Sequence, residues 1–259
     1  MKNRIKAALA KGEIAYGTWA QMLCPEFCEL ASASGFEFII IDMEHGSFGI
    51  EGATHMIRAV QSGGASAMVR VPDAAPSMIL KALDAGASAV LVPNVNSGAM
   101  AASIVAATRY APRGTRSACP SIRASSHGIV DWPSHSADCE HELQVAVLIE
   151  TQAGLDNFDE IIAVPGIDIV ALGPFDLSQA MGYCGDWKHP VVQGKLEDLV
   201  HRAIGKGLDI MPSLFDTEPA QLASQIARWR ALGARLFAVS GDRFALADAY
   251  RTMQQKLPR

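Results

Sequence analysis

The sequence predicts an α/β fold, a (β/α)8 (TIM) barrel built as a single domain over residues 1–259. Short runs rich in apolar and β-branched residues alternate with longer amphipathic stretches along the whole chain. Eight such runs occur within 259 residues, which matches the strand number and the approximate length of this barrel. No shift in composition marks a boundary between domains, so one barrel accounts for the chain.

The predicted strands are short apolar runs, and several of them lead into polar residues. They lie at residues 15–21, 36–42, 66–71, 89–95, 144–151, 168–173, 209–215 and 235–241. Proline stands near the start and glycine near the end of several intervening helices, as the fixed φ of proline and the left-handed backbone of glycine favour. Helices with such end signals are predicted at residues 25–35, 76–86, 218–233 and 242–257.

A doubly wound open sheet is the alternative α/β fold. It would normally have a glycine-rich phosphate loop after its first strand, and the segment "GTWAQMLCPE" (17–26) contains none. The longest irregular segment, residues 111–142, is too long for a simple connection. We expect it to be functional or to contain short helices.

Composition excludes several classes of protein. With 49% hydrophobic and 19% charged residues the chain can bury a large core, unlike a disordered protein. The net charge of −5, without a basic stripe, argues against nucleic acid or an anionic membrane as a partner. We find neither an apolar stretch of about 18 residues nor a secretory signal peptide. The five cysteines lack paired CxxC spacing and are typical of reduced thiols in a cytoplasmic protein.

Polar residues gather where the predicted strands end. In a barrel of this type the active site lies at the carboxyl ends of the strands. Charged residues are concentrated at the ends of the second, third, fifth and sixth strands, and milder polar or aromatic groups follow the others. The charged positions are Asp42, Glu44, His45, Arg70, Glu150 and Asp176. This clustering predicts one catalytic face.

Glu150 and Asp176 are the candidate metal ligands. They follow adjacent strands, and two carboxylates so placed would repel each other unless a cation lay between them. Oxygen ligands with room for water suit Mg²⁺ or Mn²⁺ better than a closed zinc site. Alternatively, Glu150 caps a loop or pairs with an arginine, and Asp176 caps the helix that follows it.

Arg70 and His45 each allow more than one interpretation. The planar guanidinium of Arg70 could bind a carboxylate or stabilise an enolate, or it could pair with Asp42 or Glu44. His45 could be a general base, a metal ligand or a structural histidine. The residues by themselves leave these alternatives open.

Four segments together resemble the HpcH/HpaI aldolase family, in nearly the whole chain and in the expected order. They are residues 17–46, 69–95, 108–117 and 149–183, and they include "IDMEHG", "IET" and "GPFDLS". The resemblance implies a phosphoenolpyruvate/pyruvate-binding TIM barrel with class II, metal-dependent pyruvate aldolase activity of the 2-dehydro-3-deoxyglucarate or 4-hydroxy-2-oxoheptanedioate aldolase type. It also implies a homo-oligomer, a hexamer built as a trimer of dimers.

The resemblance assigns a role to each matching residue. Glu150 and Asp176 would bind Mg²⁺, Mn²⁺ or Co²⁺, which pyruvate would chelate. Arg70 would stabilise the enolate oxygen, and His45 would transfer protons in a dyad with Asp84. The backbone of the "GPFD" turn would bind the substrate carboxylate, and two further carboxylates would orient metal-bound water. These last positions are Gly173, Pro174, Phe175 and Asp176 for the turn, and Asp42 and Glu44 for the water.

Asp84 raises a geometric question. It lies near the carboxyl end of the predicted helix 76–86, which is at the opposite face of a barrel from His45. One barrel could not easily bring the two together, so we expect Asp84 to reach the active site of a neighbouring subunit. The alternative is an ordinary carboxylate at a helix end.

Two departures from the family pattern leave the substrate open. Leu148 stands where family aldolases usually have glutamine, and an apolar side chain cannot hydrogen-bond a substrate. The segment "RSAC" (116–119) replaces the usual "RGxG". We expect this loop to shape the acceptor pocket together with Arg123 and Trp19.

The expected reaction joins pyruvate enolate to an aldehyde acceptor, or releases pyruvate from a 4-hydroxy-2-oxo acid. It needs no nucleotide and no Schiff-base lysine. Citrate synthases of siderophore pathways resemble the same family, so condensation of acetyl-CoA with oxaloacetate is the alternative. A metabolite-binding protein without activity is a third interpretation. It predicts no metal-dependent exchange of pyruvate methyl protons.

Overall fold

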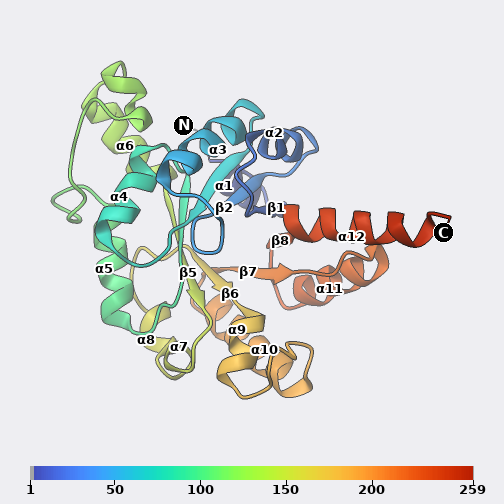
Figure 1. Ribbon diagram of the computed structural model, residues 1–259. Helices are drawn as coiled ribbons and strands as arrows, with labels where there is room; N and C mark the ends of the chain where they lie inside the picture. The colour runs from blue at the N-terminus through green and yellow to red at the C-terminus, as the bar shows by residue number, and fades with distance from the viewer. Residues whose placement is uncertain (1–2, 259) are drawn as a thin grey trace.

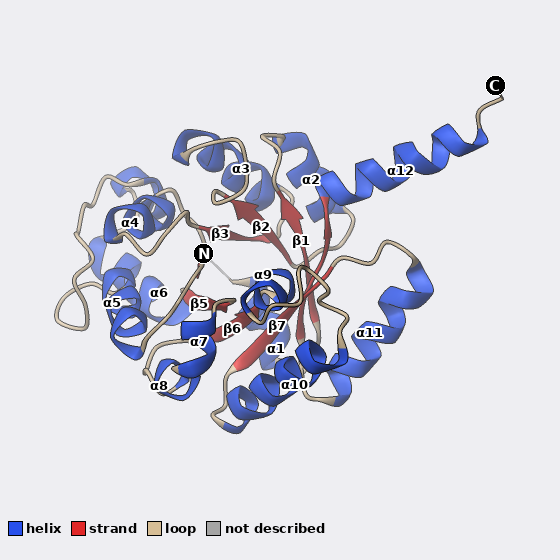
Figure 2. Ribbon diagram, turned by 60° about the horizontal axis from the view of Figure 1, so that its bottom comes forward, coloured by secondary structure: helices blue, strands red, loops and turns tan. Residues whose placement is uncertain are grey.

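The computed structural model describes residues 3–258 as a closed barrel of eight parallel strands, each paired with the next and the last with the first. Figures 1 and 2 show the strands at the centre and helices around them. The predicted TIM barrel is confirmed. The strands are β1 (Ala15–Ala20), β2 (Phe38–Asp42), β3 (Ser66–Arg70), β4 (Ala89–Val92), β5 (Gln144–Ile149), β6 (Ile169–Leu172), β7 (Asp209–Leu214) and β8 (Leu236–Gly241).

The helices connect successive strands on the outside of the barrel. They are α2 (Pro25–Ala33), α3 (Ile50–Ser62), α4 (Pro76–Asp84), α5 (Gly98–Thr108), α7 (Gln152–Asp156), α8 (Phe158–Ile162), α9 (Pro174–Ala180), α10 (Pro190–Gly205) and α11 (Pro219–Ala231), with α1 (Arg4–Ala10) before the first strand. The helix starts predicted at Pro25 and Pro76 are confirmed. Some predicted strands were too long, because at Pro93 and Glu150 the chain has already left the sheet for the barrel mouth.

Strand residues alternate between the barrel interior and the layer under the helices. The interior contains Phe38, Ile40 and Met68, whereas Ile39 and Val69 pack under the helices. Because side chains alternate along a strand, the next inward positions are the last residues of β2 and β3 and the residue after β5. Those positions are occupied by Asp42, Arg70 and Glu150. The apolar filling of the barrel therefore ends in a charged layer at the mouth.

The segment 111–142 contains a 3-10 helix (Arg123–Gly128) and α6 (Trp132–Glu142), as expected for so long a connection. It packs against the carboxyl end of α4. Arg116 Nη2 donates to Asp84 Oδ1 at 2.8 Å, and Arg123 Nη1 donates to the carbonyl of Ala85 at 2.7 Å.

The last helix, α12 (Asp242–Lys256), begins at the barrel mouth and projects away from the barrel (Figures 1 and 2). Within residues 3–258, every helix is too short or too polar to cross a membrane. All five cysteines are free thiols.

Candidate active site

A cavity of about 510 Å³ opens at the carboxyl ends of the strands. Its walls come from the loops after β1, β2, β5, β6, β7 and β8, as the barrel fold predicts for an active site. The lining residues include Trp19, Gln21, His45, Arg70, Leu148, Glu150, Gly173, Pro174, Phe175, Asp176, Trp187, Ser213, Phe215 and Phe244. Four of the six charged positions predicted from strand ends therefore line one cavity, namely His45, Arg70, Glu150 and Asp176, and Gln21 and Ser213 join them.

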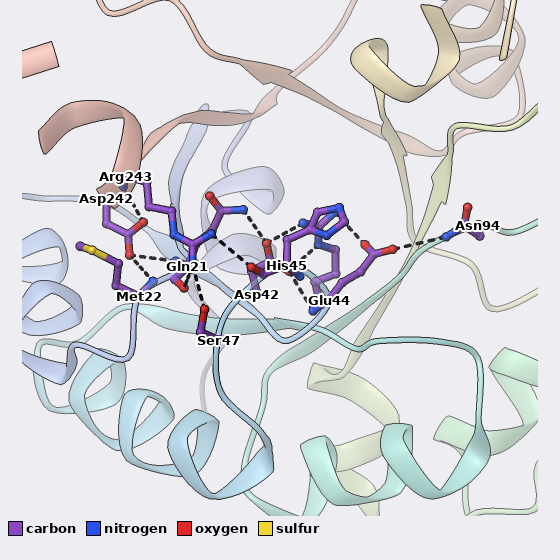
Figure 3. Close-up of polar contacts among 10 residues, drawn as sticks. Gln21, Met22, Asp42, Glu44, His45, Ser47, Asn94, Asp242 and Arg243 are labelled. Carbon is purple, nitrogen blue, oxygen red and sulfur yellow. Dashed lines mark hydrogen bonds and ion pairs between the residues drawn. The ribbon is translucent and has the colours of Figure 1, made fainter. Parts of the chain in front are cut away.

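Asp42 is fully buried beneath this cavity and is held from several directions. Arg70 donates to both of its carboxylate oxygens, at 2.8 and 2.5 Å. Gln21 Nε2 donates to Oδ2 at 2.8 Å, and the backbone N–H groups of Glu44 and His45 donate to Oδ1 at 3.1 and 3.2 Å (Figure 3). Burial raises the pKa of Asp42, but the hydrogen bonds and charge of Arg70 outweigh it and keep the pKa below its ordinary value.

Arg70 is fixed by three groups at once. Besides Asp42, its Nη1 pairs with Glu44 Oε2 at 2.9 Å, and its guanidinium lies 4.6 Å from the ring centroid of Trp19. Of the alternatives left open for Arg70, pairing with Asp42 or Glu44 is observed, and it involves both residues. A guanidinium has five N–H groups, so two remain for an oxygen atom in the cavity.

Glu150 is buried at the mouth, with 5% of its surface exposed. Its Oε1 accepts a hydrogen bond of 2.8 Å from the backbone N–H of Asn94, which has a φ of 55°. Burial raises the pKa of Glu150 to about 7; the Asn94 hydrogen bond opposes this shift, and the nearby carboxylates of Glu44 and Asp176 add to it. Gly173 leaves the space Glu150 needs, since a Cβ there would lie 2.9 Å from Oε2.

The donor set at Glu150 and Asp176 fits a hard divalent cation. Two carboxylates lie in one cavity wall, and their mutual repulsion is the kind that a cation relieves. Among residues 3–258, no three His, Cys, Asp or Glu side chains are grouped so that together they could hold a metal ion. Mg²⁺ and Mn²⁺ are commonly held by one or two carboxylates, with water or substrate filling the other positions.

The "GPFD" turn presents fewer amides than four residues suggest. Pro174 has no N–H, and the N–H of Gly173 donates to the carbonyl of Ile149 at 3.2 Å. The amides of Phe175 and Asp176, in the first turn of α9, are left for a ligand. Phe175 itself is half-exposed at the cavity rim.

The sequence model of the HpcH/HpaI aldolase/citrate lyase family matches residues 15–240. This chain belongs to that family. Its relatives include a hydroxypyruvate/pyruvate aldolase of Roseovarius nubinhibens, 34% identical over 96% of this chain and 94% of the relative. A 2-keto-3-deoxy-L-rhamnonate aldolase of Escherichia coli is also 34% identical, over 96% of this chain and 91% of the relative.

Two solved structures have the same fold as this chain. A family protein from Burkholderia cenocepacia superposes with a TM-score of 0.89 at 27% identity, covering 98% of this chain and 99% of that one. The citrate synthase SbnG superposes with a TM-score of 0.85 at 28% identity, covering 97% of this chain and 98% of that one.

Two residues expected at the active site of this family member lie elsewhere in the single chain. Asp84 ends α4, which runs back against the strands, and it pairs with Arg116. Arg123 donates to Ala85 and, from Nη2, to Gln61 at 2.7 Å. Neither lines the mouth cavity. The expectation that Arg123 shapes the acceptor pocket is therefore not met within one chain, because its loop packs at the far end of α4.

Leu148, the departure from the HpcH/HpaI pattern, is 3% exposed and lines the cavity two residues before Glu150. It continues the inward-facing layer of the barrel, so it contributes an apolar side chain to the cavity wall. Sequence reasoning missed Asp242, Arg243 and Phe244. Asp242 follows the last strand directly, which is the signal that could have found it.

Proposed function

We propose that this protein is a divalent-metal-dependent pyruvate aldolase that forms or cleaves a 4-hydroxy-2-oxo acid through pyruvate enolate. The observation that carries the proposal is the pair Glu150 and Asp176 in the wall of one cavity with the fixed guanidinium of Arg70. The curated relatives at 33–34% identity are aldolases, which are carbon–carbon lyases. Their names support a small 2-oxo acid as the substrate.

Glu150 and Asp176 would hold the metal, with Mg²⁺, Mn²⁺ or Co²⁺ as candidates. When bound, the ion supplies Lewis-acid polarisation of the substrate keto group. The two N–H groups of Arg70 not used by Asp42 and Glu44 would stabilise charge on the enolate oxygen. The amides of Phe175 and Asp176 would bind the substrate carboxylate. Glu44 would orient metal-bound water, whereas both oxygens of Asp42 are engaged by Arg70 and Gln21.

His45 would transfer the proton at the reacting carbon. Its ring lines the cavity, and its backbone N–H is held by Asp42. A dyad with Asp84 requires a second subunit, since α4 places Asp84 at the other end of the same barrel. We therefore include in the proposal that Asp84 of a neighbouring copy completes the site.

The projecting helix α12 supports a homo-oligomer, with a hexamer as the expected form. Leu246, Tyr250 and Met253 form an apolar stripe along one face of α12 and are 43%, 63% and 56% exposed. Leu257, directly after the helix, is 53% exposed. Apolar side chains repeating at intervals of three and four residues normally face a partner. A second copy of this chain is the partner that fits an aldolase assembled from identical subunits. The free thiols are consistent with a reducing, cytoplasmic location.

The decisive test is metal-dependent exchange of pyruvate methyl protons with D2O, followed by proton NMR. The proposal predicts exchange with Mg²⁺ or Mn²⁺, loss of exchange with EDTA, and pyruvate release from a 4-hydroxy-2-oxo diacid. A protein that binds pyruvate but exchanges no protons with any of the three candidate metals would contradict it.

The citrate synthase alternative is less well supported. The curated aldolases are 33–34% identical to this chain, compared with 28% for SbnG. Leu148 is the feature that bears on this alternative, because it lines the cavity wall against which a second substrate would bind. Release of free thiol from acetyl-CoA and oxaloacetate, without retro-aldol turnover, would favour the synthase.

A further inference from the structure

The first turn of α12 contacts the two loops that carry Gln21 and His45. Asp242, the first residue of the helix, is fully buried. Its Oδ2 accepts hydrogen bonds from the backbone N–H groups of Gln21 and Met22, both at 2.8 Å. Its Oδ1 accepts from the N–H of Arg243 at 2.7 Å (Figure 3). A buried carboxylate with these donors holds the loop after β1 at a fixed distance from α12.

Arg243 connects that loop to the one after β2. Its Nη1 donates to the carbonyl of His45 at 3.2 Å, and its Nη2 donates to the carbonyl of Gln21 at 3.0 Å. Nη2 also lies 3.4 Å from Ser47 Oγ. The guanidinium is a rigid fork, so its two arms set the spacing between the Gln21 and His45 carbonyls (Figure 3). A lysine could satisfy only one of the two carbonyls well.

The backbone directly before Asp242 is strained and closely packed. Ser240 has a φ of 52°, an unfavourable value for a residue with a side chain. Gly241 follows it, and a Cβ there would lie 2.9 Å from Trp19 Cβ. The β1–β8 pairing also shifts register at this point. Strained residues persist where the surrounding structure imposes them, most often next to a functional site.

We propose that Asp242 and Arg243 are positioning residues for His45, acting as a brace between the first turn of α12 and the two loops. The same brace extends to Arg70, because Gln21 Nε2 donates to Asp42 Oδ2 and Asp42 holds the guanidinium of Arg70. The inference rests on the proposed function, in which His45 transfers a proton. It adds two residues that touch neither metal nor substrate and act through the backbone.

The test compares three full-length variants in the pyruvate exchange assay with Mn²⁺. Arg243→Ala should lower kcat about tenfold, since a small displacement of a catalytic group is costly, while the KM for pyruvate stays within about twofold. Arg243→Lys should recover part of the loss. Arg251→Ala is the matched control, because Arg251 is an exposed arginine farther along the same helix, outside the apolar stripe. It should retain the kcat of the parent protein.

Hydrogen–deuterium exchange provides a readout that does not need activity. Arg243→Ala should increase deuterium uptake in peptides covering residues 20–24 and 43–49, and Arg251→Ala should not. Parent-like kcat in Arg243→Ala, or equal uptake changes in both variants, would overturn the brace. If the parent protein exchanges no pyruvate protons, the proposed function fails. The uptake result still decides whether the brace holds the two loops.

Discussion

Arg70 and Asp42 are direct neighbours in the pairing of β3 with β2, and their side chains form a buried two-point ion pair at the floor of the cavity. Nε donates to Oδ1 at 2.8 Å and Nη2 to Oδ2 at 2.5 Å. Such a pair fixes the direction of the guanidinium as well as its charge. Arg70 therefore reaches the substrate space with its remaining N–H groups already oriented.

Arg70→Lys should abolish most of the activity while retaining the positive charge. A lysine ammonium cannot form two parallel hydrogen bonds with Asp42 and also present oriented donors to an enolate. We expect kcat for pyruvate proton exchange to fall at least about a hundredfold, as for loss of an oxyanion donor. The NMR exchange assay measures this loss. Arg230→Lys on α11 is a matched control and should behave as the parent protein.

The stability of the protein should depend on the ionised form of Asp42. Because the folded-state pKa is below that of the unfolded chain, this contribution is complete above about pH 4 and is lost as the pH falls through the lower, folded-state value. Asp42→Asn removes the fully buried partner of Arg70 and should lower the free energy of unfolding by roughly 3 kcal/mol at pH 7. Urea unfolding measured between pH 7 and pH 3 should show that the difference in unfolding free energy between the parent protein and Asp42→Asn becomes smaller as the pH falls. The exposed-carboxylate control Glu13→Gln should show a small cost, and a pH-independent difference for Asp42→Asn would contradict the prediction.

Metal binding should compete with a proton at Glu150. In the absence of metal this carboxyl has a pKa of about 7, so a bound cation must displace a proton in neutral solution. Affinity for Mg²⁺ or Mn²⁺ should fall up to about tenfold per pH unit below 7. Calorimetry in buffers of different ionisation enthalpy would detect the released proton.

Two substitutions check the ligand assignment. Glu150→Gln should remove both metal binding and proton release, because an amide is a much weaker ligand for a hard cation. Glu29→Gln, on the exposed face of α2, should retain both. Undiminished affinity in Glu150→Gln would show that the metal lies elsewhere.

Leu148→Gln should change the choice of acceptor more than the handling of pyruvate. Leu148 lines the cavity beside Glu150, and an amide there would add a donor and an acceptor to an apolar wall. We expect the ratio of kcat/KM for hydroxylated over apolar aldehydes to rise about tenfold. Pyruvate exchange should stay within about threefold of the parent value. Leu148→Met conserves the apolar wall and should leave the aldehyde ratio unchanged.

The apolar stripe of α12 should control self-association. Tyr250→Glu and Met253→Glu place charges in the surface proposed to meet a second copy, which is unfavourable unless they are paired. Sedimentation velocity should show a smaller assembly, with loss of activity if Asp84 completes a neighbouring site. Gln255→Glu lies on the opposite face of the helix and should leave the assembly intact. Unchanged sedimentation of the two stripe variants would exclude this surface.

The fold, and most of the charged residues at the barrel mouth, were predictable because the sequence signals for both are local. Apolar runs of strand length mark the eight strands. Side chains alternate along a strand, so Asp42 and Glu150, two positions after the inward-facing Ile40 and Leu148, also face inward. A charged residue that follows the last apolar inward-facing position therefore lies at the carboxyl end of a barrel strand. The sequence by itself therefore determined the barrel and most of the charged residues at its mouth.

Only the tertiary structure decided which of these residues hold one another. His45 and Arg243 are 198 positions apart, and the end of β8 meets the loops after β1 and β2 because the barrel closes β8 onto β1 with a shifted register. The separation of Asp84 from His45, by contrast, follows from the direction of α4 and was already predicted from the sequence. A local sequence pattern cannot predict which distant residues meet, because such contacts depend on strand register and on where each helix end lies in space.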